Sequence, residues 1–157
     1  MTATKTDGTM WTCGENGSGQ LGVNNKTKYS SPIQVPGTTW SANQGTGGTG
    51  YNIWIRTDGT LWSAGTNGGG QLGQNNETQS SSPIQIPGTT WKYATGADQN
   101  NSFGVKTDGT LWVWGDNGNG ELGINDRTAR SSPTQVPGTT WNSVKGARGR
   151  AYGLQVV

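Results

Sequence analysis

The chain has no histidine and only one cysteine among its 157 residues. Without histidine there is no Ser-His-Asp or Cys-His catalytic group, no His-ligated zinc site and no imidazole pH switch. Cys13 cannot form an internal disulfide, and the sequence offers no histidine base to activate its thiol. We therefore expect Cys13 to be a half-buried strand residue, and we expect no catalytic residue, no cofactor and no metal ligand.

Charged and apolar residues are also scarce. Charged residues make up 13% of the chain and hydrophobic residues 28%, and the net charge is +2. So small and dispersed a charge argues against a nucleic-acid partner. No stretch approaches the roughly 20 apolar residues of a membrane span, and no secretory leader is recognised. The default expectation is therefore a cytoplasmic protein with no membrane partner.

Glycine is abundant instead, with 28 residues, and the sequence repeats itself. TDGTMW at 6–11 returns as TDGTLW at 57–62 and 107–112, and SPIQVPGTTW at 31–40 returns with one change at 82–91 and 132–141. The three copies, 6–40, 57–91 and 107–141, have no insertion or deletion. This repetition predicts one repeat domain over 1–157, with units near 1–50, 51–101 and 102–150 and a closing strand near 151–157.

Each copy has the pattern of short β-strands. Asp-Gly tolerates the positive φ of tight hairpin turns, so Asp7-Gly8, Asp58-Gly59 and Asp108-Gly109 are predicted hairpin tips. A Gly/Asn-rich loop and a short strand follow, and Pro-Gly-Thr-Thr then leads into a last strand that carries a tryptophan. About four strands per 50 residues are typical of propeller blades. We expect an all-β propeller with three four-stranded blades per chain, about thirteen strands and no helix longer than two turns.

The Gly/Asn-rich loops carry a more specific signal. GENGSGQLG at 14–22, GTNGGGQLG at 65–73 and GDNGNGELG at 115–123, with the TDGT segments before them and the Ser-Pro after them, resemble the regulator of chromosome condensation repeat family. The units are similar to bacterial and phage variants, and their near identity suits a recently amplified gene or an engineered fragment. The resemblance implies a non-enzymatic propeller, usually seven-bladed, that acts as an interaction platform.

The recurring apolar residues are expected to form the core between blades, because large tryptophans fill the space that glycines leave open. Trp54 and Trp114 fall outside this pattern and are candidates for a specialised contact. The predicted core residues are Trp11, Trp40, Trp62, Trp91, Trp112, Trp141, Leu21, Leu72 and Leu122.

Several polar patterns have a structural interpretation and a functional one. The repeated Asp7, Asp58 and Asp108 fit turn positions better than acid–base pairs or metal ligands. Asp116 to Glu121 resembles half of a calcium loop but lacks the glutamate that completes such a loop. The glycine loops lack the lysine of a phosphate-binding loop. The basic residues Lys145, Arg148 and Arg150 fit a solvated loop, or a contact with an acidic partner.

Two function classes remain open from the sequence. The first is a non-catalytic scaffold for protein binding or self-assembly, which the resemblance implies. The second is a lectin-like propeller that binds carbohydrate through tryptophan and asparagine in its loops. A carboxylate-only hydrolase is a third class, but it needs two carboxylates about 5–10 Å apart, and no such pair recurs in the repeats.

Three repeats are too few to close a propeller, which needs roughly four to eight blades. Two chains would supply six blades, so we expect a homodimeric ring and possible binding of another protein. The strand around residues 151–155 would pair beside the partner's 4–13 hairpin. The residues predicted at this oligomer interface are Thr4, Cys13, Ala151, Tyr152 and Leu154.

Overall fold

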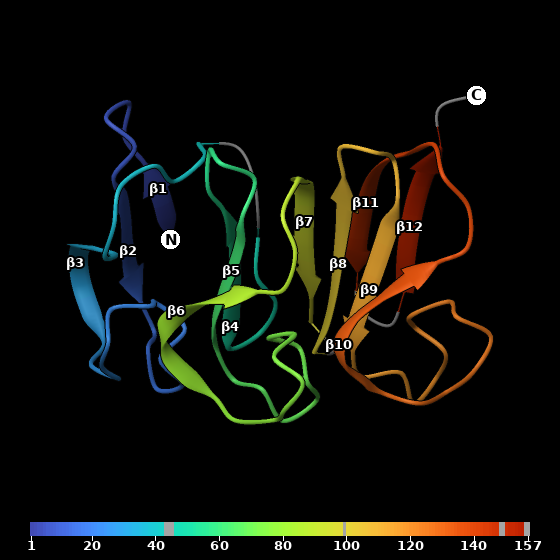
Figure 1. The fold of residues 1–157 in the computed structure, drawn as a ribbon. Helices are drawn as coiled ribbons and strands as arrows, with labels where there is room; N and C mark the ends of the chain where they lie inside the picture. Colours follow the sequence, from blue (N-terminus) through green and yellow to red (C-terminus); the bar gives the residue numbers. More distant parts are fainter. Residues whose placement is uncertain (43–45, 99, 148–149, 156–157) are drawn as a thin grey trace.

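The computed structural model describes residues 1–42, 46–98, 100–147 and 150–155 (Figure 1). Every regular element in these ranges is a strand and every strand pairing is antiparallel, which confirms the predicted all-β class. Within the same ranges, no helix is long and apolar enough to cross a lipid bilayer. The strands are β1 (Thr2–Thr4), β2 (Met10–Gly14), β3 (Tyr29–Gln34), β4 (Tyr51–Ile55), β5 (Leu61–Gly65), β6 (Ser80–Ile86), β7 (Trp91–Ala97), β8 (Asn101–Lys106), β9 (Leu111–Gly115), β10 (Arg130–Val136), β11 (Trp141–Ala147) and β12 (Arg150–Gln155).

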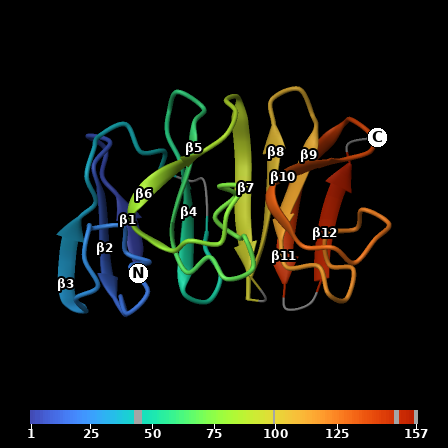
Figure 2. The ribbon, with the colours of Figure 1, turned by 60° about the horizontal axis from the view of Figure 1, so that its bottom comes forward.

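The strands form four sheets that follow one another along the chain. Their orders are β1-β2-β3, β4-β5-β6, β7-β8-β9-β10 and β11-β12. Figure 2 shows the sheets in a row in chain order. Strand β7 lies against β4 of the preceding sheet, and β11 lies against β7 and β8, so the first strands of the third and fourth sheets pack against the sheet before them.

The predicted hairpin tips are stabilised by a short relay of hydrogen bonds. In the second copy, Asp58 Oδ1 accepts from the Thr60 amide at 2.9 Å and from the Thr60 hydroxyl at 2.7 Å. The Thr60 hydroxyl oxygen in turn accepts from Trp62 Nε1 at 2.8 Å. Gly59 has a φ of +78°, which a residue with a side chain rarely adopts. The other two tips repeat this relay, so the three aspartates are turn residues, Asp7, Asp58 and Asp108.

The tryptophan strands pair differently from the sequence-based expectation. Trp91 begins β7, and β7 pairs with β8 of the following repeat instead of closing its own sheet. The Trp91 amide still donates to the carbonyl of Gly59 in its own repeat at 2.9 Å, so this segment ties two repeats together. The twelve strands are consequently divided into sheets of three, three, four and two, rather than about thirteen strands in three sheets of four. At the second sheet, the equivalent tryptophan segment forms no strand and makes only an isolated bridge, between Trp40 and Arg56.

The core lies between the sheets and contains much of the predicted set. Trp40, Trp91, Leu21, Leu72 and Leu122 are buried. The remaining four predicted core residues are half-buried, Trp11, Trp62, Trp112 and Trp141.

Trp54 on β4 and Trp114 on β9 pack against equivalent glycines of the preceding loops, although they come from different strands of their repeats. A Cβ on Gly22 would lie 3.0 Å from the Trp54 ring, and one on Gly73 would lie 3.0 Å from Trp114 Nε1. Where the second repeat has Trp54 on β4, the third has Gly104 on β8, whose Cβ would lie 2.6 Å from the Trp91 ring. Both tryptophans are buried, so each makes its contacts inside the protein, between neighbouring repeats.

Candidate functional site

Three long loops gather at one end of the molecule, at the bottom of Figure 1, and the hairpin tips lie at the other end. These loops join β2 to β3, β5 to β6 and β9 to β10. We call their residues, 15–28, 66–79 and 116–129, the loop face.

A buried asparagine holds each loop closed. Asn67 Nδ2 donates to the carbonyl of Asn76 at 2.9 Å and to that of Thr78 at 3.1 Å. Its Oδ1 accepts from the Leu72 amide at 2.8 Å. One side chain at the start of the loop therefore satisfies backbone groups from its middle and its end, which fixes the loop without regular secondary structure. The other loops have the same contacts at Asn16 and Asn117.

The backbone consequently has the same conformation in all three loops. Asn24, Asn75 and Asn125 occupy equivalent positions with φ of 60°, 56° and 61°. Asparagine is among the few residues that tolerate this left-handed conformation. The loop face thus repeats one backbone conformation, the backbone frame, three times.

One exposed position on this frame alternates in charge from repeat to repeat. The residue two positions after the left-handed asparagine is Lys26 in the first loop, Glu77 in the second and Arg127 in the third, and all three are exposed. Along the row of sheets, this position therefore reads positive, negative, positive. A fixed frame with a variable charge pattern has the properties that a specific interaction surface requires.

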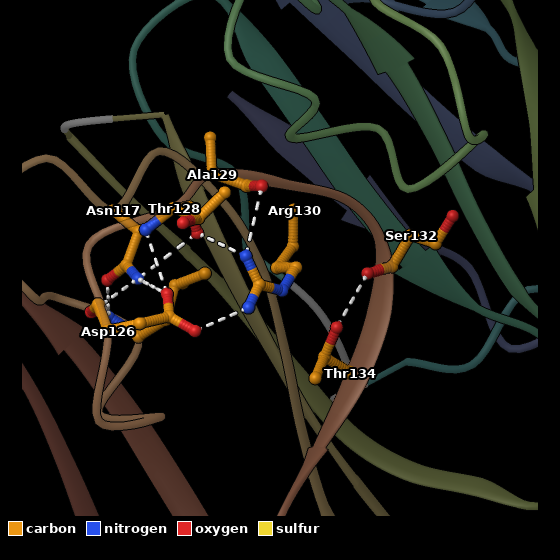
Figure 3. Close-up of polar contacts among 8 residues, drawn as sticks. Asn117, Asp126, Thr128, Ala129, Arg130, Ser132 and Thr134 are labelled. Carbon is orange, nitrogen blue, oxygen red and sulfur yellow. Dashed lines mark hydrogen bonds and ion pairs between the residues drawn. The ribbon is translucent and has the colours of Figure 1, made fainter.

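Ion pairs hold charged side chains in place on the first and third loops. Lys28 Nζ lies 2.8 Å from Glu15 Oε2, which lowers the pKa of Glu15 and raises the pKa of Lys28. In the third loop, Arg130 Nη2 lies 2.6 Å from Asp126 Oδ2, as Figure 3 shows beside the Asn117 contacts. A hydrogen bond from the Thr128 amide, assisted by Arg130, lowers the pKa of Asp126. These carboxylates remain charged at neutral pH.

The hairpin end carries a different repeated group, in which a cation lies between two tryptophans. The Arg56 guanidinium is 4.6 Å from the Trp40 ring centroid and 4.2 Å from that of Trp62. Lys106 lies in the same way between the rings of Trp91 and Trp112, at 4.9 Å and 4.3 Å. The tryptophan faces that point toward this end are therefore covered by the chain's own cations.

The acidic residues are not clustered as a metal site in the part of the chain that the structure describes. No group of three or more His, Cys, Asp or Glu side chains lies close enough there to hold a metal ion. The Glu121 carboxylate, in the segment that resembles half a calcium loop, accepts from the Asn119 amide and side chain at 2.9 and 2.8 Å. Burial opposes its charge, but these hydrogen bonds lower the pKa of Glu121.

The residues predicted at an oligomer interface lie in two separate sheets. Thr4 pairs with Met10 in the first sheet, and Cys13 is half-buried on β2. Strand β12 pairs with β11 through its backbone. Figure 2 shows these sheets at opposite ends of the row. The residues of β12 in this set are Ala151, Tyr152 and Leu154. Of the basic run, Lys145 is exposed on β11, Arg150 begins β12, and Arg148 lies outside the described residues.

The sequence interpretation missed two sets of residues. The loop asparagines Asn16, Asn67 and Asn117 were absent from the predicted core, although their identity in all three copies, beside positions that differ, indicates a structural role. The cations that directly precede each Thr-Asp-Gly turn gave a weaker signal, because Lys5, Arg56 and Lys106 share only their charge.

Comparison with known proteins places this architecture in a family. The Regulator of chromosome condensation (RCC1) repeat matches residues 7–41, 58–99 and 108–148. No curated protein matches the sequence.

Similar solved structures are Prp20p from Saccharomyces cerevisiae (TM-score 0.82, 18% identity) and human WBSCR16 (TM-score 0.81, 20% identity), each matched over 99% of this chain and 42% of the other. Yeast RCC1 (Prp20) bound to Kap60 gives a TM-score of 0.81 at 18% identity, over 99% of this chain and 40% of the other. This chain thus spans less than half the length of these propellers. The three segments that match the RCC1 repeat cover most of the sequence, and the chain therefore belongs to the RCC1 repeat family.

Proposed function

We propose that this protein is a non-catalytic propeller scaffold that binds another protein through its loop face. The observation that carries the proposal is the combination of one clamped backbone frame with an exposed charge whose sign alternates from repeat to repeat. Lys26, Glu77 and Arg127 present the order positive, negative, positive. A partner with acidic, basic and acidic groups at matching spacing would be selected over one with another order.

The solved relatives support the class of partner. Prp20p has binding properties toward Gsp1p and histones, and yeast RCC1 binds Kap60. These proteins show that the propeller architecture serves as a surface for other proteins. At 18% identity, these two structures do not indicate which protein this chain binds.

The carbohydrate-binding alternative has less support from the side chains. Sugar sites use exposed aromatic faces, but Trp40, Trp54, Trp91 and Trp114 are buried. The four other tryptophans are half-buried, and cations lie over the rings of three of them, Trp11, Trp62 and Trp112. A glycan array provides the direct test of this alternative.

Self-association is the second part of the proposal. The first sheet lacks the tryptophan strand that β7 supplies to the third sheet, and the last sheet consists of β11 and β12 alone. A second copy that brings these incomplete sheets together would form two junctions related by a two-fold axis, in a six-bladed ring. In such a ring, β12 would pair beside the partner's 4–13 hairpin. Deleting residues 151–157 should then weaken the dimer and make its melting temperature depend on concentration.

The experiment on partner binding compares charge reversals on the loop face with one elsewhere. The wild-type chain, the double variant Lys26→Glu/Arg127→Glu and the control Lys92→Glu, exposed on β7, are immobilised and used to capture proteins. A captured protein is then purified and its Kd measured for all three. The proposal expects binding that survives Lys92→Glu and falls at least roughly tenfold in the double variant, which corresponds to about 1.4 kcal/mol. Equal binding by all three variants contradicts it.

A further inference from the structure

Neighbouring repeats are held together by a loop that docks on the outer strand of the next repeat. The Asn24 amide of the first loop donates to the Ser81 carbonyl of β6 at 2.9 Å. The Ser82 hydroxyl of the same strand donates to Asn24 Oδ1 at 2.9 Å. A single asparagine therefore recognises two consecutive serines through its backbone and its side chain.

The second loop docks on the third repeat with the same contacts. The Asn75 amide donates to the Ser131 carbonyl at 2.7 Å, and the Ser132 hydroxyl donates to Asn75 Oδ1 at 3.2 Å. The repetition defines a docking rule for this chain, in which a loop asparagine faces a Ser-Ser-Pro strand.

Glycine makes the close approach in this contact possible. A Cβ on Gly19 would lie 2.5 Å from Ser81 Cα, and one on Gly70 would lie 2.6 Å from Ser131 Cα. Such distances leave no room for a side chain. The loop backbone consequently lies directly on the strand backbone.

The third loop has the docking conformation, but no strand among the described residues is docked against it. Gly120 has a φ of +85° against +77° for Gly19 and +79° for Gly70, and Asn125 has the same left-handed φ as its equivalents. No atom lies within 4 Å of a Cβ built on Gly120 or on Gly123. Gly123 is exposed, whereas Gly73, its equivalent in the docked second loop, is buried.

The complementary strand surface is β3 in the first repeat. Ser30, Ser31 and Pro32 are exposed, whereas the equivalent residues on β6 and β10 are half-buried beneath the docked loops. Gln34 serves as an internal reference, because it and its equivalents in all three repeats are exposed. Among these positions, β3 is thus more exposed than β6 and β10 only where a docked loop covers those two strands.

We infer that the third loop of one copy docks on β3 of a second copy, by the rule that joins repeats within the chain. The Asn125 amide would donate to the Ser30 carbonyl, and the Ser31 hydroxyl would donate to Asn125 Oδ1. Gly120 would lie against Ser30. This junction is head-to-tail, and it rests on the proposed self-association while naming the surfaces that carry it.

The test uses sedimentation of the 157-residue chain and of three variants. Ser30→Arg places a long side chain where the loop backbone must lie, and Gln34→Arg is the matched control on the same strand. Gly120→Ala blocks the other half, because its Cβ would meet Ser30 of a docked copy, and an alanine at a φ of +85° also strains the loop itself. The inference expects Ser30→Arg and Gly120→Ala to sediment as one chain of 16.4 kDa. It expects wild type and Gln34→Arg to sediment as a larger species.

Mixing the two blocked variants separates a lost junction from a lost fold. Ser30→Arg retains an intact loop and Gly120→Ala retains an intact β3, so an equimolar mixture should regain a species of two chains. Failure of the mixture to associate, or a Ser30→Arg variant that assembles as wild type does, overturns this junction and leaves self-association standing. A wild-type chain that sediments at 16.4 kDa contradicts both proposals.

Discussion

The loop clamp makes a quantitative prediction for Asn67→Ala. Asn67 is buried, and its replacement removes the acceptor for the Leu72 amide and the donor for the carbonyls of Asn76 and Thr78. The two carbonyls belong to exposed residues and can be hydrated, but Leu72 is buried and its amide loses its partner. An unsatisfied buried amide costs about 1–3 kcal/mol. We expect a loss near the middle of that range, about 2 kcal/mol, which for a chain of this length lowers the melting temperature by about 4–8 °C.

The matched control for this change is Gly68→Ala, one residue along the same loop. Gly68 is exposed, its φ lies outside the left-handed region, and a Cβ there has no atom within 4 Å. Thermal unfolding followed by circular dichroism compares the two variants, and amide exchange at Leu72 reports the loop directly. If Asn67→Ala melts within about 1 °C of wild type while Gly68→Ala does the same, the clamp does not hold the loop.

Other parts of the fold give shorter predictions. Burial raises the pKa of Tyr51 to about 12, and its hydroxyl bridges the second and third sheets by donating to the Asn101 carbonyl at 2.6 Å and accepting from the Ala97 amide at 3.1 Å. Urea unfolding of Tyr51→Phe should therefore show a loss of about 1–3 kcal/mol, and an unchanged midpoint contradicts the bridge. Hydrogen bonds from the threonine two residues later lower the pKa of each hairpin-tip aspartate, including Asp58. Their contribution to stability is present above the unfolded pKa near about 3.9 and is lost as the pH falls through the lower folded pKa. The melting temperature should drop below about pH 4, and replacing all three aspartates by asparagine, which keeps the acceptor, should reduce that drop.

Much of the architecture was predictable because the repeat fixes the type and order of the strands. The Asp-Gly tips and the buried Leu72 follow from turn chemistry and apolar pattern alone. The assignment of Trp91 to a sheet did not follow, because both neighbouring repeats offer an edge and only the packed structure selects β8. The packing of Trp54 and Trp114 did not follow from the repeat either, since two different strands fill the same gap.

The loop face was less predictable than the strands. Asparagine next to glycine is common in exposed turns, so the burial of Asn67 does not follow from its local sequence. Its four hydrogen bonds join residues up to eleven positions apart, a distance over which local pattern carries little information. The order of exposed charges gained meaning only after the three loops proved to share one backbone conformation.

The charge order on the loop face is tested most directly by exchanging two residues. The double variant Lys26→Glu/Glu77→Lys keeps the composition, the net charge and the backbone frame, and it changes only the order from positive, negative, positive to negative, positive, positive. The measurement is the Kd of this variant and of wild type for the protein captured by the loop face. The account predicts binding weaker by at least roughly tenfold, or about 1.4 kcal/mol. An unchanged Kd, with an unchanged melting temperature, would show that the loop face does not select the partner.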